Sequence, residues 1–122
     1  MILSQDYSNA TYQIQSFSPG KVVINHETYT HSVIISAEKL ISPWSPVNIE
    51  TVTDADLLLF LDLNPEIILL GTGEKSMMLP AKKLACLTEK QFHIECMSTA
   101  AACRTYTVLI SEGRKVAAGL II

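Results

Sequence analysis

The sequence predicts an α/β domain whose sheet contains parallel strands. Short apolar runs at 66–71 and 115–122 are typical of strands that are buried on both faces. Residues 92–97 alternate between apolar and polar, as in a half-buried strand, and the helical patterns 80–91 and 98–112 separate these segments. The order strand–helix–strand–helix–strand favours parallel strands that are joined by right-handed crossovers. A length of 122 residues suits one domain, 1–122.

The first part of the chain is rich in strand signals. Residues 11–17 partly alternate, and 18–21 have Pro-Gly at the centre, as in a type II turn. The apolar segment 22–25 would then return as the second strand of a hairpin. Residues 31–37, which are rich in β-branched side chains, predict a third strand.

The middle of the chain predicts a loop followed by a helix. Two prolines flank Trp44 within 41–48, which argues for a loop or an edge segment. Trp44 is either a core residue beneath this loop, which tryptophan burial favours, or a half-exposed aromatic side chain at an interface. Residues 53–64 follow a helical pattern that Thr53 can cap.

Composition excludes several classes of protein. Hydrophobic residues make up 48% of the chain and charged residues 17%, which argues against disorder. The net charge is −3 and there is no basic stripe, so we expect no nucleic-acid partner. No apolar run approaches the ~20 residues of a membrane span, and "MILSQDYSNA" (1–10) lacks the features of a signal peptide.

The three cysteines are too few and too far apart for a disulfide framework. Their number is odd and no pair has CxxC spacing, so a reducing, cytoplasmic location fits best. The three histidines show no metal-binding spacing, alone or with the cysteines. We therefore predict no metal site, no cofactor and no catalytic residue, and the chain leans towards a non-enzyme.

The helix at 98–112 has two distinct faces. Cys103 falls on the inner face, where we expect a small buried side chain instead of a reactive thiolate. Arg104 points outwards with Ala101 and Val108, one turn away on either side. This is either an interaction patch, to which an interfacial Trp44 could add, or an ordinary solvated arginine.

A second candidate site lies at the turn that follows 66–71. The Gly71-Thr72-Gly73 turn matches neither a Walker A loop nor a dinucleotide fingerprint, and a tight turn explains it more simply. If 66–71 and 92–97 are parallel neighbours, however, this turn lies beside the start of helix 98–112. The amides of Ser98, Thr99 and Ala100 could then hold an anion, and Arg104 belongs to the same candidate ligand site.

Two segments resemble a known family. "PEIILLGTGEK" (65–75) and "MSTAAACRTYTVLISEGRKVAAGLII" (97–122) are similar to the domain-of-unknown-function family 498, as are "INHETYTHSVIIS" (24–36) and Trp44. The resemblance covers about 12–122. Relatives in that family include small bacterial and archaeal proteins, a mitochondrial respiratory complex I assembly factor and an adipogenesis-associated protein.

The resemblance implies a single three-layer α/β domain with a mixed central sheet, helices and a small additional β hairpin layer. It implies no established catalytic activity, and its motif positions here are Gly71, Thr72, Gly73, Thr99, Cys103, Arg104 and Tyr106. The family usually has aspartate where this chain has Ser98 and asparagine where it has Thr107. Ser98 can still cap a helix.

Two functional hypotheses follow. The first is a non-enzymatic protein–protein module, similar to an assembly factor, with an unidentified protein partner and a possible peripheral association with membranes through that partner's complex. The second is a small-molecule or anion-binding protein, or an undiscovered enzyme, that uses the Gly71–Gly73 turn and the start of helix 98–112.

Overall fold

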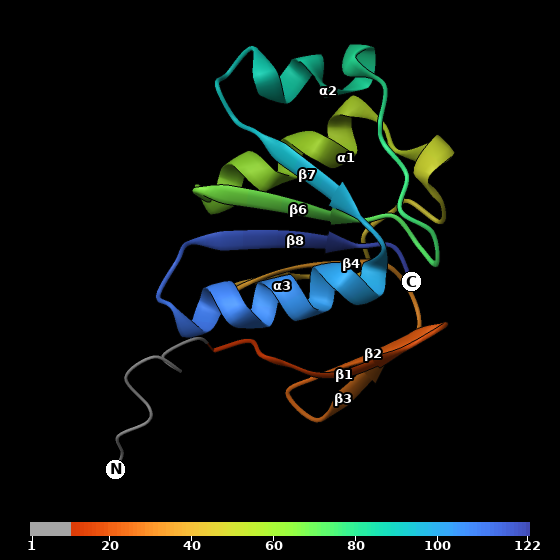
Figure 1. The fold of residues 1–122 in the computed structure, drawn as a ribbon, viewed down its shortest axis with the longest axis vertical. Helices are drawn as coiled ribbons and strands as arrows, with labels where there is room; N and C mark the ends of the chain where they lie inside the picture. The colour runs from red at the N-terminus through yellow and green to blue at the C-terminus, as the bar shows by residue number, and fades with distance from the viewer. Residues whose placement is uncertain (1–10) are drawn as a thin grey trace.

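The computed structural model describes residues 11–122, which form a mixed α/β domain around a five-stranded sheet (Figure 1). The central sheet has the order β5-β4-β8-β6-β7. Strand β6 is parallel to both β7 and β8, whereas β4 is antiparallel to β8 and to β5, so the sheet is mixed as expected. Its strands are β4 (Val33–Ser36), β5 (Leu40–Ile41), β6 (Ile67–Gly71), β7 (Ile94–Met97) and β8 (Val116–Leu120).

A small antiparallel sheet forms a separate layer. It consists of β1 (Ile14–Ser18), β2 (Lys21–Ile24) and β3 (Glu27–Tyr29). The predicted hairpin turn is confirmed, since Ser18 pairs with Lys21 and Gly20 has φ +88°. The sequence missed β3, which is short and polar. The apolar segment predicted as a third strand is β4, and it lies in the central sheet beside β8.

Helices cover both faces of the central sheet. Helix α3 (Thr99–Ser111) and the small sheet lie on one face, and α1 (Asp54–Leu58) and α2 (Ala81–Thr88) lie on the other. The predicted helix at 53–64 begins as α1 but continues as a 3-10 helix, η3 (Leu59–Leu63). A shorter 3-10 helix, η2 (Ile49–Thr51), precedes α1.

Local signals for the helix starts agree with the structure in most cases. The hydroxyl of Thr53 accepts the N–H of Asp56, and the carboxylate of Asp56 accepts the N–H of Thr53. This reciprocal pair is a capping box. Pro80, predicted in the first turn of its helix, instead stands at the N-cap with extended ψ, because α2 begins one residue later.

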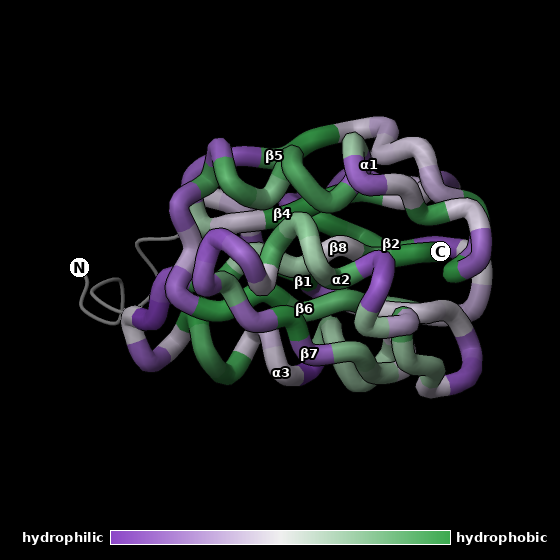
Figure 2. Tube along the Cα trace, turned by 90° about the horizontal axis from the view of Figure 1, so that it is seen from above, coloured by the Kyte–Doolittle hydropathy of each residue, from purple (hydrophilic) through white to green (hydrophobic). Residues whose placement is uncertain are grey.

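The core divides into two clusters, one on each face of the central sheet. In Figure 2 the central strands β4 and β6 are mostly hydrophobic green, and hydrophilic purple gathers at turns around the rim. The cluster beneath α3 joins α3, the small sheet and the central strands through Val22, Ile24, Val33, Ile35, Leu69, Cys103 and Tyr106. The opposite cluster includes Trp44, Leu57, Phe60, Ile68, Leu70 and Leu87.

Trp44 is a core residue of the second cluster. Its side chain is 2% exposed, its indole N–H donates to the carbonyl of Asp56 at 3.3 Å, and its ring meets Phe60 edge-on. Gly119 makes room for both rings, since a Cβ there would lie 2.7 Å from each. The core interpretation of Trp44 is therefore correct. Its assignment to an interaction patch with α3 is wrong, because it is buried on the other face of the sheet.

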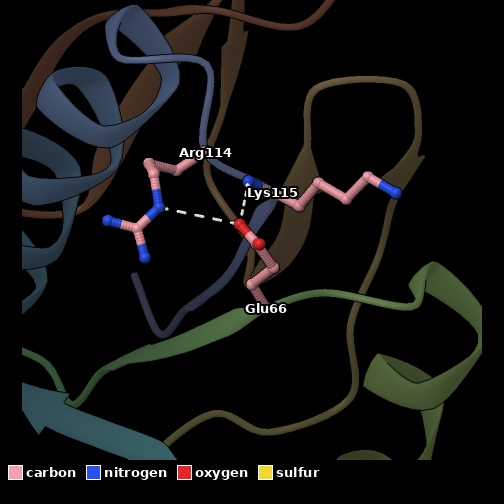
Figure 3. Close-up of polar contacts among 3 residues, drawn as sticks. All are labelled: Glu66, Arg114 and Lys115. Carbon is pink, nitrogen blue, oxygen red and sulfur yellow. Dashed lines mark hydrogen bonds and ion pairs between the residues drawn. The ribbon is translucent and has the colours of Figure 1, made fainter.

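The amino-terminal end of the parallel strands is fastened by Glu66 (Figure 3). Its carboxylate accepts the N–H of Lys115 at 3.2 Å and lies 3.6 Å from the guanidinium of Arg114. The N–H of Glu66 donates to the carbonyl of Lys115 at 2.8 Å. These contacts hold the starts of β6 and β8 together, at the end of the sheet opposite Gly71.

None of the helices between residues 11 and 122 is long and apolar enough to cross a membrane. The expectation that the chain has no signal peptide concerns residues 1–10, which lie outside the described residues.

Candidate functional site

The Gly71–Gly73 turn lies beside the start of α3, as expected if the strands before them are parallel neighbours. Strands β6 and β7 are parallel neighbours, with Gly71 opposite Met97. The N–H of Thr72 donates to the carbonyl of Met97 at 2.8 Å, which extends the pairing into the turn. The connections after the two strands leave on opposite faces of the sheet, to α2 and to α3. Ligands bind at such switch points in open α/β sheets.

In this chain, the polar groups at the switch point form hydrogen bonds with one another. The hydroxyl of Thr99 accepts the N–H of Gly73 at 2.8 Å and donates to the carbonyl of Ile121 at 2.7 Å. The N–H of Thr99 donates to the carbonyl of Gly73 at 2.8 Å. The buried Thr99 thus ties together the turn after β6, the start of α3 and the end of β8. The amide of Thr99, one of the three proposed to bind an anion, is therefore already hydrogen-bonded within the chain.

Gly71 allows α3 to approach the sheet closely. A Cβ at this position would lie 2.8 Å from the Cα and 2.9 Å from the hydroxyl of Thr99, and 3.2 Å from the Cβ of Ala102. Such distances are shorter than van der Waals contact. The glycine is therefore required by packing, as a close-approach position between strand and helix.

The neighbouring motif residues also serve the fold. The hydroxyl of Thr72 lies within hydrogen-bonding distance of the carbonyls of Lys75 and Met97, and it accepts the N–H of Met77. Gly73 has φ +102°, a conformation that favours glycine. Ser98 caps α3 by accepting the N–H of Ala101 at 3.2 Å.

Cys103 lies in the core, as predicted. It is buried among the residues beneath α3, and this burial raises the pKa of its thiol to about 12, although Arg104 acts in the opposite direction. A thiol with that pKa is neutral near pH 7 and a poor nucleophile. Tyr106 is also buried, its hydroxyl donates to the carbonyl of Tyr12 at 2.9 Å, and burial raises its pKa.

Arg104 differs from the other motif residues because its side chain is exposed. Within residues 11–122 its guanidinium has no hydrogen bond or ion pair, and the one ion pair of this region lies at Glu66 and Arg114. Val108, one turn further along α3, is 54% exposed, and Ala101, on the preceding turn, is partly exposed. Arg104, Ala101 and Val108 are hereafter called the α3 patch.

Sequence reasoning missed a second exposed apolar feature. Met77 and Met78, in the loop between β6 and α2, are 43% and 78% exposed. The available signal was a pair of large apolar residues placed between a glycine turn and Pro80, outside any periodic segment. Residues 11–122 contain no group of three or more His, Cys, Asp or Glu side chains that could hold a metal ion.

Comparison with known proteins identifies the family. Residues 14–121 match the model of the family described as "Protein of unknown function (DUF498/DUF598)". The chain is 30% identical to the "13 kDa major membrane protein" of Francisella tularensis subsp. holarctica over 99% of each chain. It is 26% identical to NADH dehydrogenase [ubiquinone] 1 alpha subcomplex assembly factor 3 of Mus musculus, and the match covers 98% of this chain but 65% of the mouse protein.

A solved structure agrees with this assignment. The crystal structure of a Bordetella parapertussis protein superposes with a TM-score of 0.85 and 28% identity, over 91% of this chain and 95% of the other. Residues 14–121, which match the family model, include both sheets and all three α-helices described above. The chain therefore belongs to the DUF498/DUF598 family of proteins of unknown function.

Proposed function

We propose that this chain is a non-enzymatic protein–protein interaction module whose partner docks on the α3 patch. The observation that carries the proposal is the state of Arg104. The other six motif positions are buried, packed or hydrogen-bonded within the chain, whereas Arg104 is exposed and unpaired among the described residues. Packing and hydrogen bonding within the fold explain those six positions. They do not explain Arg104.

The chemistry of the α3 patch suits a protein surface with an acidic group. Arginine offers a planar fork of donors that binds a carboxylate through two hydrogen bonds, and it is frequent at interface hot spots. Val108 supplies apolar area next to this charge, and the small side chain of Ala101 lets a partner approach the helix. The partner we expect therefore presents an Asp or Glu beside an apolar side chain.

The relatives support the same class of function. The mouse relative is named as an assembly factor for an NADH dehydrogenase subcomplex, a name that is consistent with a protein partner. The cytoplasmic location stays a proposal. Because the Francisella relative is named as a membrane protein, cell fractionation should accompany any test of location.

Affinity capture from the cells that make this protein tests the proposal. The wild type is compared with Arg104→Glu and Val108→Asp, which reverse the charge and remove the apolar contact. Lys39→Glu is the matched control, since it makes the same charge reversal at an exposed residue of the connection between β4 and β5, outside the α3 patch. We expect one set of proteins to be captured by the wild type and the control and lost from both patch variants. Equal capture by all four proteins would exclude the α3 patch.

Ligand binding at the Gly71–Gly73 turn is the alternative proposal. Thr99 already occupies the amide of Gly73 with its hydroxyl and uses its own amide on the carbonyl of Gly73. An anion would have to displace both bonds or use the remaining first-turn amides. Titration with phosphate, sulfate and nucleotides, followed by amide chemical shifts, decides the matter. Unchanged shifts at 71–73 and 98–100 would exclude the site.

A further inference from the structure

The loop between β6 and α2 presents two methionines to solvent. Met78 is 78% exposed and Met77 is 43% exposed, whereas the adjacent Leu79 is buried in the core beneath α1 and α2. Leu79 and the hydrogen bond from the N–H of Met77 to the hydroxyl of Thr72 hold the loop in place. The two methionines therefore project from an anchored loop. Methionine is flexible and polarisable, so it adapts to irregular apolar surroundings.

A third exposed apolar side chain belongs to the same corner. Val47, just before η2, is 72% exposed. The ammonium group of Lys83 in α2 donates to the carbonyls of Glu50 and Val52 at 3.0 and 2.9 Å, which holds the start of α2 against η2. In Figure 1 the loop before α2 and the η2 segment lie at the same end of the molecule. The corner thus combines apolar groups from two segments distant in sequence.

The segment that carries the methionines is basic, whereas the η2 side of the corner carries the acidic Glu50. Residues 75–83 contain Lys75, Lys82 and Lys83 and no acidic residue, although Glu74 borders them. The whole chain has nine basic and twelve acidic residues, so six basic and twelve acidic residues lie outside this segment. The positive amino ends of α2 and α3 also lie at this end of the sheet.

We propose that residues 74–83 dock on an anionic membrane surface, with Met77 and Met78 inserted at the boundary between headgroups and acyl chains. The lysines on either side of the methionines would then lie at the level of the lipid phosphates. Charge complementarity favours this occupant, because Lys75 and Lys82 lie on either side of Met77 and of Met78, which is the most exposed large apolar side chain among residues 11–122. Apolar insertion flanked by lysines is the usual chemistry of peripheral membrane attachment.

The expected attachment is reversible. Burial of one methionine side chain should strengthen binding by about tenfold, and each lysine near an anionic surface should contribute about fivefold. Two methionines and two free lysines, Lys75 and Lys82, therefore give binding that depends on both apolar insertion and anionic lipid. Loss of either the methionine side chains or the lysine charges should release the protein from vesicles at moderate lipid concentration.

Vesicle co-sedimentation of the full chain tests the proposal. Phosphatidylcholine vesicles with and without phosphatidylglycerol are mixed with the wild type, with Met77→Ser/Met78→Ser and with Lys75→Gln/Lys82→Gln. We expect the wild type to bind the anionic vesicles alone, and each double variant to bind at least tenfold more weakly. Salt at about 0.5 M should also weaken binding, because it screens the lysines.

Matched controls separate a local effect from a general one. Lys39→Gln/Lys90→Gln removes the same charge at the opposite end of the molecule and should bind as the wild type does. Spin-labelled lipid should broaden the methyl signals of Met77 and Met78 in the bound protein. Failure of the wild type to bind anionic vesicles would overturn the proposal and leave the methionines to a protein partner. Binding that survives in Met77→Ser/Met78→Ser would overturn it too.

Discussion

Replacing Gly71 by alanine tests whether this glycine is required for packing between α3 and the central sheet. The new methyl group would lie 2.8 Å from the Cα of Thr99 and 3.2 Å from the Cβ of Ala102. Carbon atoms prefer separations of about 3.5–4.0 Å. Because the first contact is with backbone, a rotamer change cannot relieve it. Helix α3 would therefore have to move away from β6 by about 1 Å.

The cost follows from this geometry. The φ angle of Gly71 is outside the left-handed region, so alanine brings no backbone strain and the penalty is steric. Overpacking of a dense core costs about 1–3 kcal/mol. We expect the upper end, about 3 kcal/mol, because withdrawal of α3 would also lengthen the hydrogen bonds between Gly73 and Thr99. The melting temperature should fall by roughly 10 °C.

Urea unfolding, followed by circular dichroism and by the fluorescence of Trp44, measures this loss. Hydrogen exchange should show weaker protection at Gly73 and Thr99 than in the wild type. Gly20→Ala is the matched control, since Gly20 has φ +88° and an added Cβ there would have no neighbour within 4 Å. It should cost about 1–2 kcal/mol through backbone strain alone and leave that protection unchanged. A free energy of unfolding for Gly71→Ala within about 0.5 kcal/mol of the wild-type value would refute the packing argument.

Three further predictions concern α3. Thr99→Val removes the hydroxyl that joins Gly73 to Ile121, so urea unfolding should show a loss of about 2 kcal/mol; an unchanged midpoint would contradict the bridging role. Ser98→Asp keeps a capping oxygen and adds negative charge at the positive end of α3. Thermal melting at low salt should show a gain of about 0.5 kcal/mol that added salt removes, and a loss would contradict this. Burial raises the pKa of Cys103 to about 12 from an ordinary 9.0, so the contribution of its neutral thiol to stability holds below pH 9 and is lost as the pH rises towards 12. Iodoacetamide at pH 8 should modify Cys103 only after unfolding. If mass spectrometry detects modified Cys103 in the native protein, the burial of this thiol is contradicted.

Local signals predicted the helices and most of the strands. The Pro-Gly turn, the Thr53 cap and the apolar runs at 66–71 and 115–122 each depend on a few adjacent residues, so they are readable in sequence. The inner face of α3 was also predicted, because helical periodicity alone places Cys103 towards the core. The order of elements favoured a parallel pair of strands, and the structure shows that β6 and β7 form one.

Features that depend on distant contacts could not be predicted in the same way. Strand β3 has three mostly polar residues, and only its pairing with β2 makes it a strand. The position of β4 depends on pairing with β8, more than 80 residues away in the sequence. Thr99 shows the same limit at the candidate site. Its hydroxyl could equally have faced a ligand, and only the approach of Ile121 shows that it bonds to the chain itself.

The proposed docking role of Arg104 can be tested without disturbing the fold. Its exposed side chain makes no hydrogen bond or ion pair within residues 11–122, so substitutions there should change stability by no more than about 0.5 kcal/mol. Gly71 and Thr99 lie at the same corner, yet their substitution should cost several times more because both are fixed by packing. Loss of a partner from a stable Arg104→Glu protein would therefore report on recognition, whereas the same loss from Gly71→Ala would report only on an altered fold.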